Sequence, residues 1–106
     1  MNRDAMRELS VRKCIDFERI KQDSNWGQQN HNDLGWLAIL TEEVGEAAQC
    51  VCKTALRPID PEADAYYELL EYEIVQIAAV AIAWIECIRR RDSQSVPSAP
   101  SVDERN

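Results

Sequence analysis

The chain reads IVQIAAVAIAWIECI from Ile74 to Ile88, and this stretch decides the fold. It is apolar nearly all round a helix, whereas a surface helix carries its apolar residues on one stripe. It is too short to span a bilayer and contains Gln76 and Glu86. Three helices of one chain cannot cover such a helix. The stretch therefore predicts the centre of a helical bundle that assembles from several copies.

The segments on either side also predict helices. Asp60, Pro61 and Glu62 supply an N-cap, a first-turn proline and a first-turn acid, so the central helix is expected to begin there and end near Arg91. A second helix is predicted over about 36–54, with one buried stripe on it. That stripe has apolar residues at spacings of three and four: Leu37, Leu40, Val44, Ala47, Ala48 and Val51.

The N-terminal part gives a weaker pattern. An imperfect apolar periodicity predicts a first helix that begins at Asp4 or Ser10 and ends at Gln22. The polar stretch from Asp23 to Gly35 is expected to be a loop, and residues 56–60 a short connector.

The composition fits one helical domain. The chain has 106 residues, 45% of them apolar, and only 3 Gly and 4 Pro, so strands joined by tight turns are not expected. We expect an all-α domain over residues 1–92 with two long core helices. Residues 93–106 are rich in Ser, Pro and charges and are expected to form a disordered tail.

The charge balance restricts the possible partners. Nineteen acidic residues against 12 basic ones give a net charge of −7, which repels nucleic-acid phosphates and anionic membranes. A cationic partner, such as a metal ion, is more natural. The four cysteines form no C-x-x-C pair and are expected to be reduced and mostly packed. With no leader-like segment at the start, these features predict a cytoplasmic protein.

Two carboxylates on the predicted second helix are neighbours. Glu43 and Glu46 lie on one helical face, where like charges cost a few tenths of a kcal/mol unless a cation lies between them. An ordinary solvated acidic face explains this pair equally well.

Glu73 on the central helix lies in the wrong place for a charge. Helical geometry puts it, with Gln76, inside the apolar sector, whereas Glu68, Glu86 and Arg90 line up on the other side and are expected to face solvent. Its neighbours in that sector are Tyr66, Leu70, Ile77, Val80 and Trp84. Burying an unpaired carboxylate costs several kcal/mol. Glu73 must therefore meet a cation, take up a proton or open onto a cleft.

A divalent ion is one solution. If the two helices pack so that Glu43 and Glu46 face Glu73 and Gln76, the oxygen ligands suit Mg²⁺. The other solution is an ion pair with Lys53, which lies on the same side of its helix as Glu46. The pattern alone leaves both open.

Two segments resemble a known family. The sequences WLAILTEEVGE, which ends at Glu46, and EIVQIAAVA, which begins at Glu73, resemble the MazG-like all-α nucleotide pyrophosphatases. The similarity extends over about residues 26–88 and is greatest to short single-domain members from phages and mobile elements. That family carries E-x-x-E on one helix and E-x-x-D on the next, and these side chains bind Mg²⁺. Glu43, Glu46 and Glu73 match the motif, whereas Gln76 stands where the family has Asp.

The resemblance implies an activity. It is the Mg²⁺-dependent hydrolysis of a nucleoside or deoxynucleoside triphosphate to the monophosphate and pyrophosphate, with Mn²⁺ as a possible substitute ion. Glu43 or Glu42 is then the general base. Gln76 removes one charge from the metal site, so a nucleotide sensor that does not cleave is a competing hypothesis. A non-catalytic helical interaction module is another.

The resemblance also implies a substrate loop. The sequence WGQQNH from Trp26 to His31 resembles the W-G-x-Q-N-H stretch of close relatives. Trp26 would stack on a base, and Gln29, Asn30 or His31 would hydrogen-bond its edge. Core anchoring for the tryptophan and turn formation for the amides are the alternatives. Lys53 and the run from Arg89 to Arg91 are the candidate phosphate-binding cations.

Relatives of this kind form dimers and tetramers, so a homodimer or homotetramer is expected. The apolar side of the central helix that faces away from Glu73 is expected to be covered by other copies. That side consists of Val75, Ala79 and Ile82.

Overall fold

A computed structural model describes residues 8–55 and 63–94, and these ranges contain three helices and no strands. The helices are α2 (Val11–Trp26), α3 (Asp33–Ala55) and α4 (Ala63–Gln94). The all-α prediction is therefore confirmed. The predicted helix start at residues 60–62 lies outside the described residues, as does most of the predicted tail. Ser93 and Gln94, assigned to that tail, instead belong to α4.

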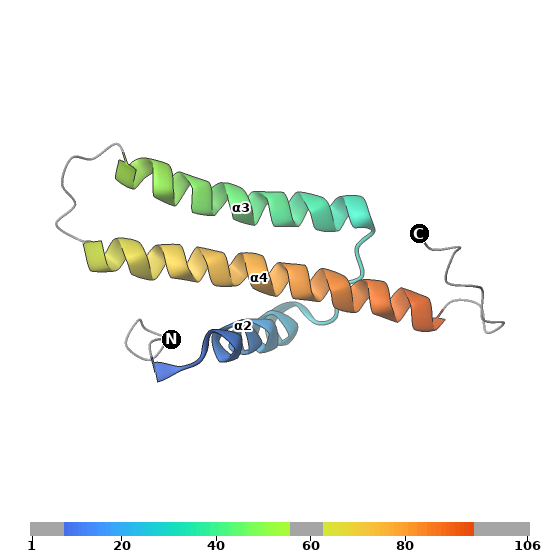
Figure 1. Cartoon of the computed structure of the whole chain (residues 1–106). Coiled ribbons are helices and arrows are strands. Elements are labelled where there is room, and N and C mark those ends of the chain that lie inside the picture. Colours follow the sequence, from blue (N-terminus) through green and yellow to red (C-terminus); the bar gives the residue numbers. More distant parts are fainter. Residues whose placement is uncertain (1–7, 56–62, 95–106) are drawn as a thin grey trace.

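Helix α4 is the central helix of the structure. Both α3 and α2 pack against it, and α3 runs antiparallel along much of its length (Figure 1). None of the described helices is long and apolar enough to cross a membrane.

Helix α2 begins at one of the two predicted caps. The Ser10 Oγ accepts a hydrogen bond from the Lys13 N–H at 3.2 Å, which satisfies a backbone donor that the helix itself leaves free. The helix continues past the predicted end at Gln22 and stops at Gly27. Gly27 has φ +70°, a conformation that favours glycine, and its N–H donates to the Asp23 carbonyl at 2.9 Å.

The loop predicted from Asp23 to Gly35 is much shorter, since only residues 27–32 are outside a helix. At its C-terminal end the loop is shorter than predicted because Asn32 caps α3. Its Oδ1 accepts from the Gly35 N–H at 2.8 Å, and its carbonyl accepts from the Trp36 N–H at 3.0 Å. This cap starts α3 at Asp33, before the first apolar residue that the periodicity detects.

The buried face of α3 differs from the predicted stripe by about one residue. Trp36, only 2% exposed, forms a core cluster with Val80, Ala83 and Cys87 of α4, and Ile39, Leu40 and Trp84 pack against this cluster. Leu37, Val44 and Val51 were expected to be buried, but 44–49% of each residue is exposed. Trp36 occupies the inner position, and Leu40 is the member of the predicted stripe that packs against its cluster.

The far side of α4 also differs from the prediction. Ala79 is fully buried within the single chain, and Val75 and Ile82 are half-buried. Glu86 lies seven residues after Ala79, hence on the same side of α4, and contacts Arg19 of α2. Helix α2 therefore covers the side that was expected to need another copy.

Candidate functional site

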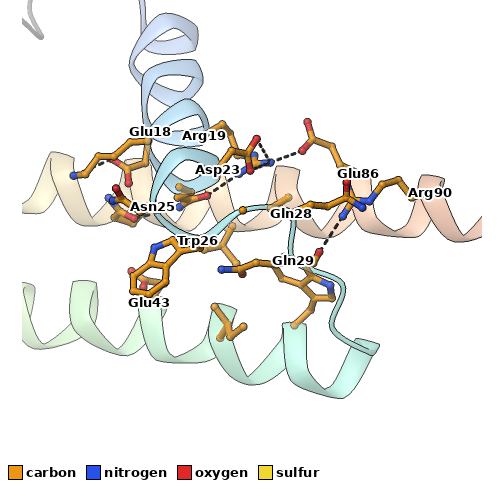
Figure 2. Close-up of a pocket in the computed structure, with 18 of the residues that line it drawn as sticks. Glu18, Arg19, Asp23, Asn25, Trp26, Gln28, Gln29, Glu43, Glu86 and Arg90 are labelled. Atoms are coloured by element: carbon orange, nitrogen blue, oxygen red, sulfur yellow. Dashed lines mark hydrogen bonds and ion pairs between the residues drawn. The ribbon is translucent and has the colours of Figure 1, made fainter.

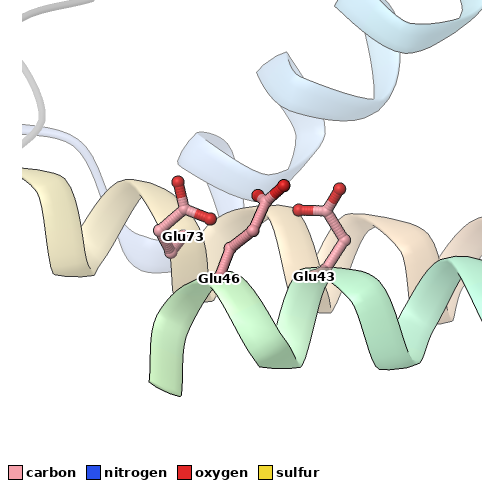
Figure 3. A group of neighbouring side chains, drawn as sticks. All are labelled: Glu43, Glu46 and Glu73. Atoms are coloured by element: carbon pink, nitrogen blue, oxygen red, sulfur yellow. The ribbon is translucent and has the colours of Figure 1, made fainter. Parts of the chain in front are cut away.

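Three carboxylates meet where α3 and α4 run side by side. Glu43 and Glu46 of α3 and Glu73 of α4 each offer an oxygen, and these atoms lie within 4.8 Å of one another. Figure 3 shows the three side chains projecting to the same side of the two helices. The expected arrangement of these three residues is present. Glu73 is 9% exposed, Glu43 half-buried and Glu46 exposed.

Glu73 is the electrostatically unusual member. Its Oε2 is buried and has no hydrogen-bond partner among the described residues. Burial raises the pKa of Glu73 to about 7, and a hydrogen bond that protonated Glu73 donates to Glu46 and the charges of Glu46 and Glu43 contribute further. Without a cation, the cluster therefore keeps a proton on Glu73 near neutral pH.

Glu43 is affected by the same surroundings. Partial burial raises its pKa, and the negative charges of Glu46, Glu42 and Glu18 raise it further. A divalent ion would offset all of this repulsion. The set of carboxylate oxygens and the orphaned Glu73 Oε2 fit a hard cation such as Mg²⁺.

A cavity of about 540 Å³ adjoins the cluster. Residues of α2, the 27–32 loop, α3 and α4 line it, and Figure 2 shows α2 and α3 on opposite sides of it. Glu43 and Gln76 are among the lining residues, so the carboxylate cluster meets this space through Glu43. Its wall also carries the aromatic rings of Trp26 and Tyr72.

Gln76 is the fourth predicted metal ligand and is half-buried. Its Oε1 accepts a hydrogen bond from the Gln22 Nε2 of α2 at 3.5 Å. Its own Nε2 is buried and has no partner within the described part of the chain. Gln76 lies one turn after Glu73 and therefore joins this part of α4 to α2 without adding a charge.

The predicted substrate loop divides into two parts. Trp26 and Gln29 line the cavity, and Trp26 is 70% exposed. Asn30 and His31 instead fix the loop, because Arg90 donates to the Asn30 Oδ1 at 3.0 Å and to the Gln29 carbonyl at 2.9 Å. The His31 ring packs edge-on against Trp36 with the ring centroids 4.9 Å apart.

Of the α4 residues expected to face solvent, Arg90 is half-buried and holds the loop, so the expectation is wrong for it. Glu86 is exposed as expected, with 48% of its side chain accessible, and also pairs with Arg19 at 2.6 Å. Glu68 is exposed as expected. The local surface pattern could not reveal that α2 and its loop would cover this side.

Among the candidate phosphate-binding cations, Arg90 lines the cavity, whereas Lys53, Arg89 and Arg91 do not. Lys53 is exposed in the last turn of α3 and does not line the cavity. The ion pairs among the described residues do not include it. Arg91 pairs with Asp33 at 2.6 Å, which, with a hydrogen bond from Trp84, lowers the pKa of Asp33.

Sequence reasoning missed the polar face of α2. Glu18, Arg19 and Gln22 line the cavity and are half-buried, whereas Phe17 and Ile20 are 49% and 64% exposed. The spacing of four between Glu18 and Gln22 places them on one face of the helix. This regular polar pattern beside the imperfect apolar one was the available signal.

Comparisons of the chain with models of protein families, with curated proteins and with solved structures find no match. The site must therefore be interpreted from its own geometry.

Proposed function

We propose that the protein is a Mg²⁺-dependent nucleotide pyrophosphohydrolase that converts a nucleoside or deoxynucleoside triphosphate to the monophosphate and pyrophosphate. The observation that carries this proposal is Glu73, a buried carboxylate with an orphaned oxygen beside two more carboxylates. A structural ion pair would explain such a residue only if a cation of the chain contacted it. Its described neighbours in the cluster are acids instead.

The cavity supports a nucleotide as the substrate. Its volume of about 540 Å³ falls in the range typical of small-molecule sites. Trp26 provides an exposed ring for stacking on a base. Arg19 and Lys21 bring positive charge to the same wall. With Arg90, which also lines the cavity, these cations are the candidates for contact with phosphate oxygens in place of Lys53.

Glu43 is the better of the two candidate general bases. It lines the cavity, whereas Glu42 is exposed and does not. Bound Mg²⁺ would offset the charge of the phosphates and make water a stronger nucleophile. Because the chain is strongly acidic, a polyanionic substrate would bind poorly without the ion.

We further propose that the active form is a homodimer or homotetramer. Leu37, Val44 and Val51 recur every seven residues along α3 and are each nearly half exposed. Ile74 and Ile85 of α4 are 52% and 50% exposed. Such exposed apolar residues along long helices favour association with another helix.

A nucleotide sensor that binds without cleaving is the second candidate. The hydrogen bond that engages Gln76 with Gln22 favours it, because this side chain brings no charge to the cluster. A purely acidic interaction surface is less favoured, because Glu73 is buried.

The test is release of pyrophosphate from the common ribo- and deoxyribonucleoside triphosphates, with Mg²⁺ and with chelator. We expect turnover with Mg²⁺, none with chelator, and loss of turnover in Glu73→Gln and Glu46→Gln. Glu68→Gln removes one exposed charge from α4 and is the matched control. Metal-dependent nucleotide binding without product would favour the sensor. The absence of both binding and turnover would refute the two hypotheses together.

A further inference from the structure

A fourth carboxylate faces the cluster from a different helix. Glu18 of α2 lines the same cavity as Glu43 and Gln76, and Figure 2 shows it on α2 across from Glu43. Only 11% of its side chain is exposed. The two carboxylates therefore share one cavity, to which they belong from different helices.

Lys21 is the cation that contacts Glu18 within the described chain, and its ion pair with Glu18 is long and largely solvated. The Lys21 Nζ lies 3.8 Å from the Glu18 oxygen, and 55% of the Lys21 side chain is exposed. The same ammonium lies 5.6 Å from the centre of the Tyr72 ring. A partner that is largely solvated and shared gives little compensation for an enclosed carboxylate.

Glu18 lies on the same face of α2 as Gln22, the residue that contacts Gln76. Gln22 lies one turn after Glu18 on α2 and donates its hydrogen bond to Gln76. The same face of α2 thus contacts Gln76 through Gln22 and carries Glu18 on the wall of the cavity that Glu43 also lines. Gln76 lies one turn after Glu73 on α4 and brings a neutral amide, not a charge, to this side of the helix.

We propose that Glu18 is the fourth carboxylate of the metal centre and supplies from α2 the negative charge that Gln76 does not. The proposal rests on the metal centre of the proposed function. Its independent support is the buried, unpartnered Oε2 of Glu73, which already requires a cation at this place. Glu18 is not one of the three residues whose oxygens converge within 4.8 Å. It therefore acts on the waters that Mg²⁺ usually retains, as a positioning residue.

One consequence concerns α2 itself. This helix carries polar residues on its inner face, and its position matters to the centre through Glu18. Like charges on α2 and α3 repel each other across the cavity when no cation is present. A bound ion would remove this repulsion and draw the two walls together.

The test measures Mn²⁺ binding to the full chain without nucleotide, by calorimetry and by the paramagnetic signal of free Mn²⁺. We expect Glu18→Gln to weaken binding by about tenfold or more, as outer-shell substitutions at metal sites do. Asp16→Asn is the matched control, because it removes one charge from an exposed position of the same helix. It should bind Mn²⁺ like the unchanged protein.

A rescue variant separates charge from folding. The double variant Glu18→Gln with Gln76→Glu restores the number of carboxylates and should recover most of the lost affinity. Lys21→Gln should not weaken binding. If Lys21→Gln weakens it as much as Glu18→Gln does, or if the rescue fails while the circular dichroism spectrum is unchanged, the role of Glu18 is structural and the proposal is wrong.

The outcomes also separate this proposal from the proposed function. If Glu73→Gln abolishes Mn²⁺ binding and Glu18→Gln leaves it unchanged, the metal centre stands and the role of Glu18 is refuted. If the unchanged protein binds no Mn²⁺, the metal centre itself is refuted, and Glu18 has no metal to serve.

Discussion

At the scale of single residues, the sequence could locate Glu73 because the helical period alone places it among apolar neighbours. The same reasoning could not locate Glu18. Its side chain becomes enclosed only when α2 packs on α4, and that packing depends on contacts such as Arg19 with Glu86, 67 residues apart. Asn30 and His31 were assigned to substrate on the basis of resemblance. Arg90, whose partner the local sequence does not reveal, holds Asn30 in the loop.

Glu73 makes stability depend on pH in a definite direction. Its pKa rises from 4.5 to about 7 on folding, so between these values the folded state binds more protons than the unfolded state. The free energy of unfolding in chelator should therefore fall as pH rises from about 4.5 to about 7, by on the order of 2 kcal/mol. Glu73→Gln should lack this part of the decline. Urea denaturation of both proteins across this range measures the difference.

Saturating Mg²⁺ should restore the stability that the unchanged protein loses as pH rises, because the ion takes the place of the proton on Glu73. At pH 7.5 we expect Mg²⁺ to raise the melting temperature of the unchanged protein but not that of Glu73→Gln. Ca²⁺ and high NaCl serve as controls for size and for general screening. An equal rise in both proteins would show that the ion acts elsewhere.

At the scale of helices, the capping residues determine where each helix begins, and packing against α4 determines which face of it is buried. Ser10 has a recognisable capping position, and α2 begins just after it. Asn32 also caps a helix, but it lies in a polar segment that resembles a loop as a whole. The buried face of α3 was misplaced because Trp36 and Leu37 are adjacent and equally apolar. Only contact with α4 shows which of them is inside.

The 27–32 loop should depend on one arginine of α4. Arg90 donates to both the Gln29 carbonyl and the Asn30 Oδ1, so Arg90→Ala leaves these acceptors without their charged donor. We expect a loss of about 1–2 kcal/mol in the free energy of unfolding. The exposed neighbour Arg89 gives the control variant Arg89→Ala, which should change stability little. Faster amide hydrogen exchange across the loop in Arg90→Ala alone would locate the effect.

At the scale of the whole molecule, α4 remains only partly covered. Helices α2 and α3 bury Ala79, Val80, Ala83 and Cys87, but the exposed apolar residues of α3 and α4 lie outside that core. The sequence predicts a helix that is apolar nearly all round, and Ile74 and Ile85 of this helix stay half exposed in the single chain. It could not show which side stays open, because this depends on where α2 packs.

The exposed apolar residues of α3, which are Leu37, Val44 and Val51, therefore predict an interface with another copy of the chain. If Leu37 and Val51 bury their side chains against another copy, Leu37→Glu or Val51→Glu should cost about 1.5 kcal/mol in each copy of a two-fold interface. The sum of about 3 kcal/mol corresponds to a dissociation constant raised by about a hundredfold. Sedimentation velocity over a dilution series measures this constant.

Phe17→Glu, on the exposed side of α2, is a control of similar exposure. An unchanged protein that stays monomeric at the highest concentration would contradict the prediction. Weakening by Phe17→Glu instead would place the interface on α2.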